Sequence, residues 1–110
     1  MNLTLQTKET EAGTRVMVEG EIDAYTAPEL RETLIPLTEK QNTEVVVDLA
    51  NVEYIDSTGL GIFIGALKSA HSNGSELAIT GVNERVHRLF SITGLDEVID
   101  IDGERREGAK

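Results

Sequence analysis

Hydrophobic and polar residues alternate along the N-terminal part of this chain. The alternation runs over residues 2–9 and again over residues 14–23, which is the period of a strand with one buried face. Gly13 closes a short polar stretch between the two segments. The pattern predicts two strands joined by a hairpin turn around Glu11 to Gly13, the first strand lying at the edge of a sheet.

The rest of the chain alternates between helical spacing and short apolar runs. Apolar residues recur every three or four positions in the helical segments, whereas residues 44–52 form an apolar run that predicts a strand covered on both faces. The predicted elements are a helix at 26–40, a strand at 44–52, a helix at 57–70, a strand at 75–82, a helix at 83–94 and a strand at 96–101. This order predicts an α/β fold with a mixed, mostly parallel sheet, an N-terminal antiparallel edge strand and helices packed on it.

Helix boundaries are marked by residues with capping preferences. Thr26 followed three positions later by Glu29 has the pattern of a capping box. Pro36 interrupts the same helix and predicts a kink or an early end there. Asn83 is a predicted N-cap for the last helix, and Gly94 is its predicted stop.

Several polar residues follow the predicted parallel strands. Asp23 ends one strand, Asp56 and Ser57 precede the middle helix, and residues 81–83 precede the last helix. In parallel α/β units these strand ends collect along one edge of the sheet, where ligands and partners bind. We therefore expect Asp23 and Ser57 to be neighbours in space.

The middle helix is unusual because it contains glycines. Its predicted core face consists of Leu60, Phe63, Ile64, Leu67 and Ala70, and its predicted outer face consists of Gly61, Ile62, Gly65 and Ser69. A glycine inside a helix costs about 1 kcal/mol relative to alanine, so two on one face need a reason. Either another protein packs closely there, with Ile62 as its apolar contact, or a loop of this chain does.

Ser57 has several chemical interpretations. It could cap the helix by accepting a backbone N–H. A catalytic nucleophile would need a base, but nothing in the spacing brings His71 or His87 to Ser57. Ile55 also stands where a nucleophile elbow has its first glycine, so the sequence argues against a serine hydrolase.

Two further interpretations concern phosphate. Gly59, Gly61 and Gly65 resemble a dinucleotide-binding fingerprint, although about nine residues separate them from the apolar strand that ends at Leu49. Alternatively, another enzyme phosphorylates Ser57, whose position at a helix N-terminus suits a phosphate. Such a phosphate would act mainly on whatever docks over the glycine face.

Composition and net charge exclude some classes of binding partner. The chain has 110 residues with a formal net charge of −10, which disfavours binding to nucleic acids and to anionic membranes. It has no cysteine, no apolar run long enough to span a membrane and no secretory signal, which predicts a cytoplasmic protein. We expect one domain over residues 1–110, with an ordered core at about 3–101 and a tail at 102–110.

Three motifs together resemble a known family. The segments "GEIDAYTAPEL", "DSTGLG" after an apolar strand and "RLFSITGLDEVIDI" are similar to those of the anti-sigma factor antagonists of the STAS-domain family, especially general-stress regulators of Gram-positive bacteria. The similarity extends over roughly residues 3–101. It implies a non-enzymatic regulator of stress-response transcription that needs no cofactor.

The resemblance also implies a switch between partners. In such proteins the serine corresponding to Ser57 is phosphorylated by an anti-sigma factor that is a serine kinase, phosphorylation abolishes binding, and a PP2C-type phosphatase reverses it. The partner-binding residues implied in this way are Asp23, Asp56, Ser57, Thr58, Gly59, Gly61, Ile62 and Gly65. The alternative is a small nucleotide- or ligand-binding domain that uses the helix start with Gly59, Gly61 and Gly65.

Overall fold

A five-stranded sheet organises the computed structural model, which describes residues 3–102. The strands stand in the order β1-β2-β3-β4-β5; β1 pairs with β2 antiparallel and all other pairs are parallel. The elements are β1 (Leu3–Glu9), β2 (Gly13–Ile22), α1 (Ala27–Thr38), β3 (Glu44–Ile55), α2 (Ser57–Ser72), β4 (Glu76–Thr80), α3 (Glu84–Ile92), the 3-10 helix η1 (Leu95–Glu97) and β5 (Asp100–Ile101). The predicted fold class is confirmed. Of the predicted tail at 102–110, Asp102 is described, and residues 103–110 lie outside the described residues.

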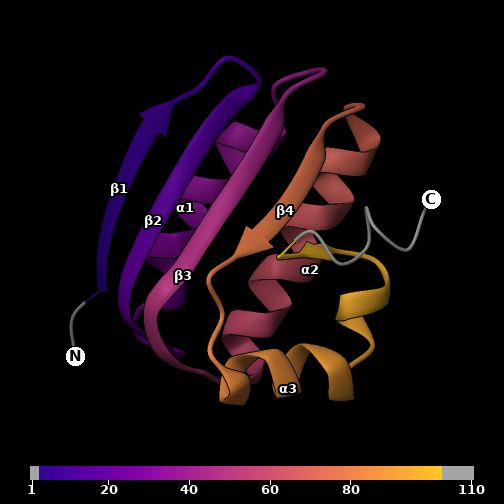
Figure 1. Cartoon of the computed structure of the whole chain (residues 1–110). Helices are drawn as coiled ribbons and strands as arrows, with labels where there is room; N and C mark the ends of the chain where they lie inside the picture. The colour runs from indigo at the N-terminus through magenta and orange to yellow at the C-terminus, as the bar shows by residue number, and fades with distance from the viewer. Residues whose placement is uncertain (1–2, 103–110) are drawn as a thin grey trace.

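The helices α1 and α2 cover one face of the sheet, and α3 lies at its lower end in the view of Figure 1. The core lies between the sheet and these helices. Phe63 of α2 and Phe90 of α3 are both fully buried, and their rings meet edge to face at 5.7 Å between centroids. This contact fixes α3 against α2, because edge-to-face ring pairs add about 0.5–1.5 kcal/mol to the burial of their surface.

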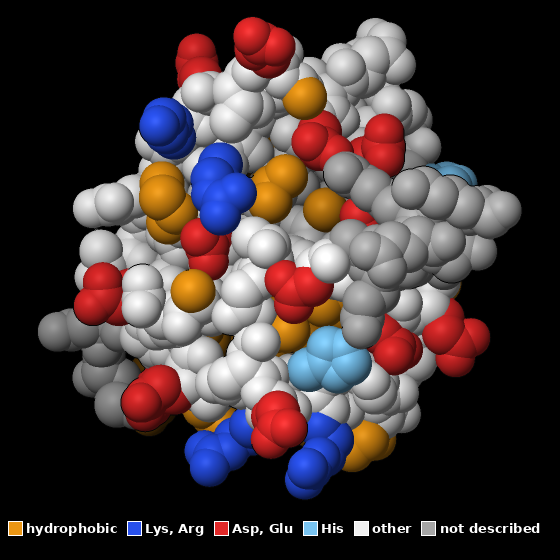
Figure 2. Space-filling view, viewed as in Figure 1, with side chains coloured by type: hydrophobic (Ala, Val, Ile, Leu, Met, Phe, Trp, Pro, Cys, Tyr) orange, Lys and Arg blue, Asp and Glu red, His pale blue; other side chains and the backbone are white. Residues whose placement is uncertain are grey.

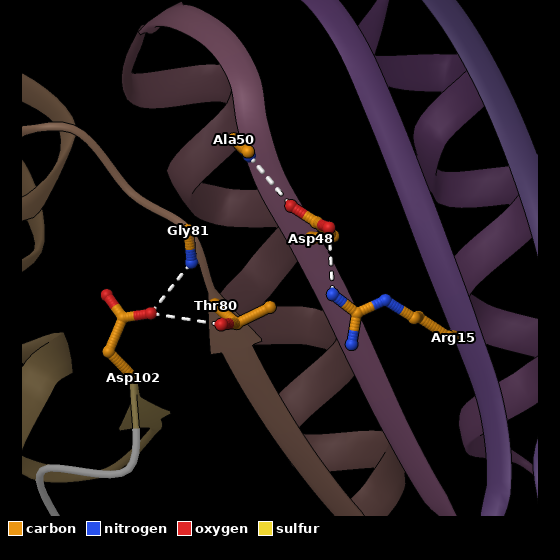
Figure 3. Close-up of polar contacts among 6 residues, drawn as sticks. All are labelled: Arg15, Asp48, Ala50, Thr80, Gly81 and Asp102. Carbon is orange, nitrogen blue, oxygen red and sulfur yellow. Dashed lines mark hydrogen bonds and ion pairs between the residues drawn. The ribbon is translucent and has the colours of Figure 1, made fainter.

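β3 is covered by helices on one face only, so the prediction of a strand buried on both faces was wrong. Val45 and Val47 point into the core, whereas Val46 and Asp48 are only half-buried on the other face. There Asp48 receives a hydrogen bond from Arg15 of β2 at 2.8 Å (Figure 3). Figure 2 shows this open face with acidic and basic side chains scattered among small hydrophobic patches.

The start of α1 differs from the predicted capping box. The hydroxyl of Thr26 makes no cap hydrogen bond and donates instead to the carbonyl of Glu21 at 2.8 Å. The carboxylate of Asp23 accepts from the N–H groups of Tyr25 and Thr26, so it organises the turn before the helix. Further on, α1 continues through Pro36 to Thr38 and does not end at the proline.

The last described residue is tied to the sheet. The carboxylate of Asp102 accepts from the Thr80 hydroxyl at 3.0 Å and from the Gly81 N–H at 2.7 Å (Figure 3). The N–H of Asp102 donates to the carbonyl of Ile79. These bonds hold the end of β5 against β4 and the connection that leads to α3.

Candidate functional site

The ends of β2 and β3 bring the two acidic segments together. Ile22 pairs with Ile55 in the parallel register, and the N–H of Asp56 donates to the carbonyl of Ile22 at 3.0 Å. Asp23 and Asp56 follow these paired residues directly. The turn that carries Asp23 therefore lies beside the segment that carries Asp56 and Ser57, as the topology predicted.

Asp56, and not Ser57, caps α2. Its carboxylate accepts from the Gly59 N–H at 3.0 Å, and its backbone carbonyl accepts from Leu60 at 3.0 Å. Ser57 is the first residue of the helix and is exposed. Its hydroxyl is thus free of the capping role and faces solvent at the positive end of the helix dipole.

Gly59 is a packing requirement of the fold. It is buried, and a Cβ placed on it would lie 2.5 Å from a methyl carbon of Ile22 and 2.8 Å from one of Ile55. The missing side chain lets the first turn of α2 approach both strands. Gly59 thus positions Ser57, although Gly59 itself presents no surface to a partner.

Gly61 and Gly65 have no such requirement. Gly61 is exposed, Gly65 is half-buried, and no atom other than those of the adjoining helix backbone comes within 4 Å of a Cβ built on either. Packing by a loop of the same chain therefore does not explain them within residues 3–102. The bare helix surface at these positions is open to an outside contact.

The core face of α2 differs in part from the predicted one. Leu60, Phe63 and Ala70 are buried as expected, but Ile64 is 38% exposed and Ala66 occupies the core in its place. Ile62, expected to be exposed, is half-buried against the core. The core face is therefore rotated toward the side of Gly59 and Ala66.

Comparison with known proteins decides the family. Residues 4–108 match the family model described as "STAS domain". The chain belongs to the STAS-domain family. The resemblance inferred from the sequence motifs is thus confirmed.

This STAS domain is similar to named regulators. It is 47% identical to the anti-sigma-B factor antagonist of Staphylococcus epidermidis over 102 residues, 93% of this chain and 94% of the relative. It is 45% identical to the anti-sigma-B factor antagonist of Staphylococcus aureus strain NCTC 8325, with the same coverage. A solved anti-sigma factor antagonist from Mycobacterium paratuberculosis superimposes with a TM-score of 0.81 at 25% identity, over 91% of this chain and 85% of that one.

The spacing argument against a nucleotide site was wrong in this STAS domain. β3 continues beyond Leu49 to Ile55, so the strand and the helix are joined by a tight turn. Two contacts oppose phosphate binding here instead. The Asp56 carboxylate already accepts the Gly59 N–H, and Gly59 is buried against the strands, so the cradle of free N–H groups that a pyrophosphate needs is not formed.

No catalytic pairing is formed at Ser57 among the described residues. His71 lies in the last turn of α2, about four turns or ~21 Å along the helix axis from Ser57. His87 lies on α3. Residues 3–102 also contain no cluster of three or more side chains that could hold a metal ion, and no helix in this range is long and apolar enough to cross a bilayer.

One residue beside the site was not predicted from the sequence. Tyr25 follows Asp23 in the turn before α1, and its side chain is 88% exposed. A large aromatic residue in a short turn between a strand and a helix is a signal that could have been used, because aromatic residues are enriched where partners bind. Its position next to Asp23 extends the candidate surface.

Proposed function

We propose that this STAS domain is an anti-sigma factor antagonist of the sigma-B type. In its unphosphorylated form it binds an anti-sigma factor that is also a serine kinase, and the sigma factor is released to direct stress-response transcription. The similarity to the two staphylococcal antagonists supports this role. The observation that carries it is the exposed Ser57 at the start of α2, one turn before the bare surface at Gly61.

The proposed contact surface combines three kinds of residue. Asp23 and Asp56 shape the two turns that meet at the strand ends. Ser57 and Thr58 are exposed in the first turn of α2. Gly61, Ile62 and Gly65 continue the surface along the helix, where the absence of side chains at the glycines allows a partner backbone to approach closely.

Phosphorylation would act on this surface directly. The Ser57 oxygen attacks the γ-phosphorus of ATP held by the kinase, ADP leaves, and the hydroxyl proton passes to a base of the kinase. The product adds about −1.5 to −2 charges beside Asp23 and Asp56. A partner that covers Ser57 would have to desolvate this charge, so the complex dissociates. Because Ser57 is exposed, the same position is accessible to a PP2C-type phosphatase, which would transfer the phosphoryl group to water.

Titration calorimetry with the purified anti-sigma factor tests this function. Ser57→Ala should bind like the wild type, and Ser57→Asp should bind at least ~10-fold more weakly, a loss of about 1.4 kcal/mol. Ser72→Asp is the matched control, because it places the same charge on the same helix at its other end. Equal affinities of Ser57→Ala and Ser57→Asp would contradict the proposal. Phosphopeptide mass spectrometry after incubation with the kinase and ATP should find phosphate on Ser57.

A further inference from the structure

A groove between α1 and α2 adjoins the Ser57 surface. Its volume is about 570 Å³. Pro28, Ile35 and Pro36 line it from α1, and Thr58 and Ile62 line it from α2. Arg31 and Glu32 also line this groove. The lining is mostly apolar, unlike other hollows of the surface, such as the one lined by Glu21, Glu53 and Arg88.

We propose that this groove receives an apolar side chain of the anti-sigma factor and anchors the complex. This inference rests on the proposed function. The groove is continuous with the switch residue, because Thr58 lines it and directly follows Ser57. A partner that lies over Ser57 and the bare surface at Gly61 therefore also covers Ile62, which forms part of the groove.

The composition of the groove defines its occupant. Pro28, Ile35 and Pro36 present apolar side chains to the groove from α1, and Arg31 and Glu32 add one basic and one acidic group to it. An aliphatic or aromatic side chain fits such a lining, since it gains from leaving water and leaves no polar group unpaired. Asp23 directly precedes Ala24, and Asp56 lies two residues before Thr58; both Ala24 and Thr58 line the groove. The chain also carries a net charge of −10, so the anchoring side chain should have a basic residue near it.

The groove and Ser57 should contribute to binding in different ways. The apolar anchor supplies affinity that does not depend on the charge at Ser57, whereas a phosphate at Ser57 opposes closure of the adjacent polar part. Loss of the anchor should thus impair recognition of the unphosphorylated substrate without changing the chemistry at Ser57. In kinase assays this corresponds to a higher KM at an unchanged kcat.

Two variants test the anchor. Pro36→Lys fills the groove from an exposed position, and the new residue also restores a helical N–H. Ile62→Ala removes one wall of the groove. Each should raise the Kd for purified anti-sigma factor by about tenfold, the order expected when a buried aliphatic side chain loses its pocket. Each should also raise the KM for phosphorylation by a similar factor. Ile92→Lys is the control, because it changes an apolar residue on α3 that is 73% exposed, and its Kd should change less than about twofold.

The outcomes distinguish a failure of the groove proposal from a failure of the proposed function. If Ser57→Asp weakens binding while folded Pro36→Lys and Ile62→Ala bind like the wild type, the groove is not an anchor and the proposed function stands. If neither Ser57→Asp nor the groove variants change binding, the proposed function itself fails. If the groove variants instead change the sedimentation of the isolated chain, the groove is covered by a second copy and the proposal is overturned. Thermal unfolding by circular dichroism verifies that each variant is folded.

Discussion

The carboxylate of Asp56 accepts the N–H of Gly59 at 3.0 Å and so closes the first turn of α2. This bond leaves the side chain of Ser57, which lies between the two residues, exposed at the helix N-terminus. The capping function and the proposed phosphorylation are thereby divided between neighbouring residues. Because Asp56 supplies the cap, the first turn of α2 does not depend on a hydrogen bond from the Ser57 side chain.

The cap predicts a specific stability change. Asp56→Ala should lower the free energy of unfolding by about 1 kcal/mol, because it leaves the Gly59 N–H without an acceptor. Asp56→Asn should lose much less, since its side-chain oxygen can accept the same bond. Urea denaturation followed by circular dichroism measures both. Equal losses in the two variants would mean that the charge of Asp56 matters and the bond does not.

Gly59 predicts a steric cost. Gly59→Ala places a Cβ within 2.8 Å of methyl groups of both Ile22 and Ile55. It should therefore destabilise the domain by roughly 1–3 kcal/mol, despite the better helix propensity of alanine. Chemical denaturation provides the measurement. Unchanged or increased stability would show that the strands adapt to the extra methyl group.

At Gly61 the same substitution to alanine should increase stability, in contrast to Gly59. A Cβ at this exposed position meets nothing within 4 Å, so Gly61→Ala should stabilise the isolated domain by up to about 1 kcal/mol. The same variant should bind the anti-sigma factor more weakly, because the methyl group keeps the partner backbone away. Calorimetric titration next to urea denaturation tests both halves. A stabilised variant with wild-type affinity would remove Gly61 from the interface.

The hydrogen bonds of Asp102 at the end of β5 should contribute to the stability of the domain. Asp102→Ala removes the acceptor for Thr80 and Gly81 and places alanine at a φ of 52°, in the left-handed region. It should lower stability by about 1–2 kcal/mol. Asp102→Asn should be close to wild type, since asparagine keeps an oxygen acceptor and tolerates this backbone conformation. Thermal denaturation compares the stability of the two variants. An equal loss of stability in both would show that the side-chain hydrogen bonds of Asp102 do not stabilise the domain.

Much of the fold could be predicted from local patterns. The order of strands and helices followed from the hydrophobic period, and the Asn83 cap, whose side chain accepts from Val86 at 2.8 Å, followed from residue preference. The placement of the turn with Asp23 beside the segment with Asp56 and Ser57 followed from the parallel topology. The three motifs, including the one around Ser57, were together sufficient to recognise the family. These features depend on neighbours in sequence or on general rules of chain connection, and the sequence by itself determined them.

Other features were decided only by tertiary packing. An apolar run such as 44–52 does not state which face of its strand the helices will cover, so the half-exposed Val46 was not foreseen. The rotation of α2 that buries Ala66 and exposes Ile64 depends on how closely Gly59 allows the helix to approach the strands. The Thr26 hydroxyl donates to the carbonyl of Glu21 and accepts the N–H of Asp23, so its partners lie in the preceding turn and not in the helix. The groove beside Ser57 likewise forms only when α1 and α2 pack side by side. Such contacts join residues far apart in the chain, and only the packed structure determines their geometry.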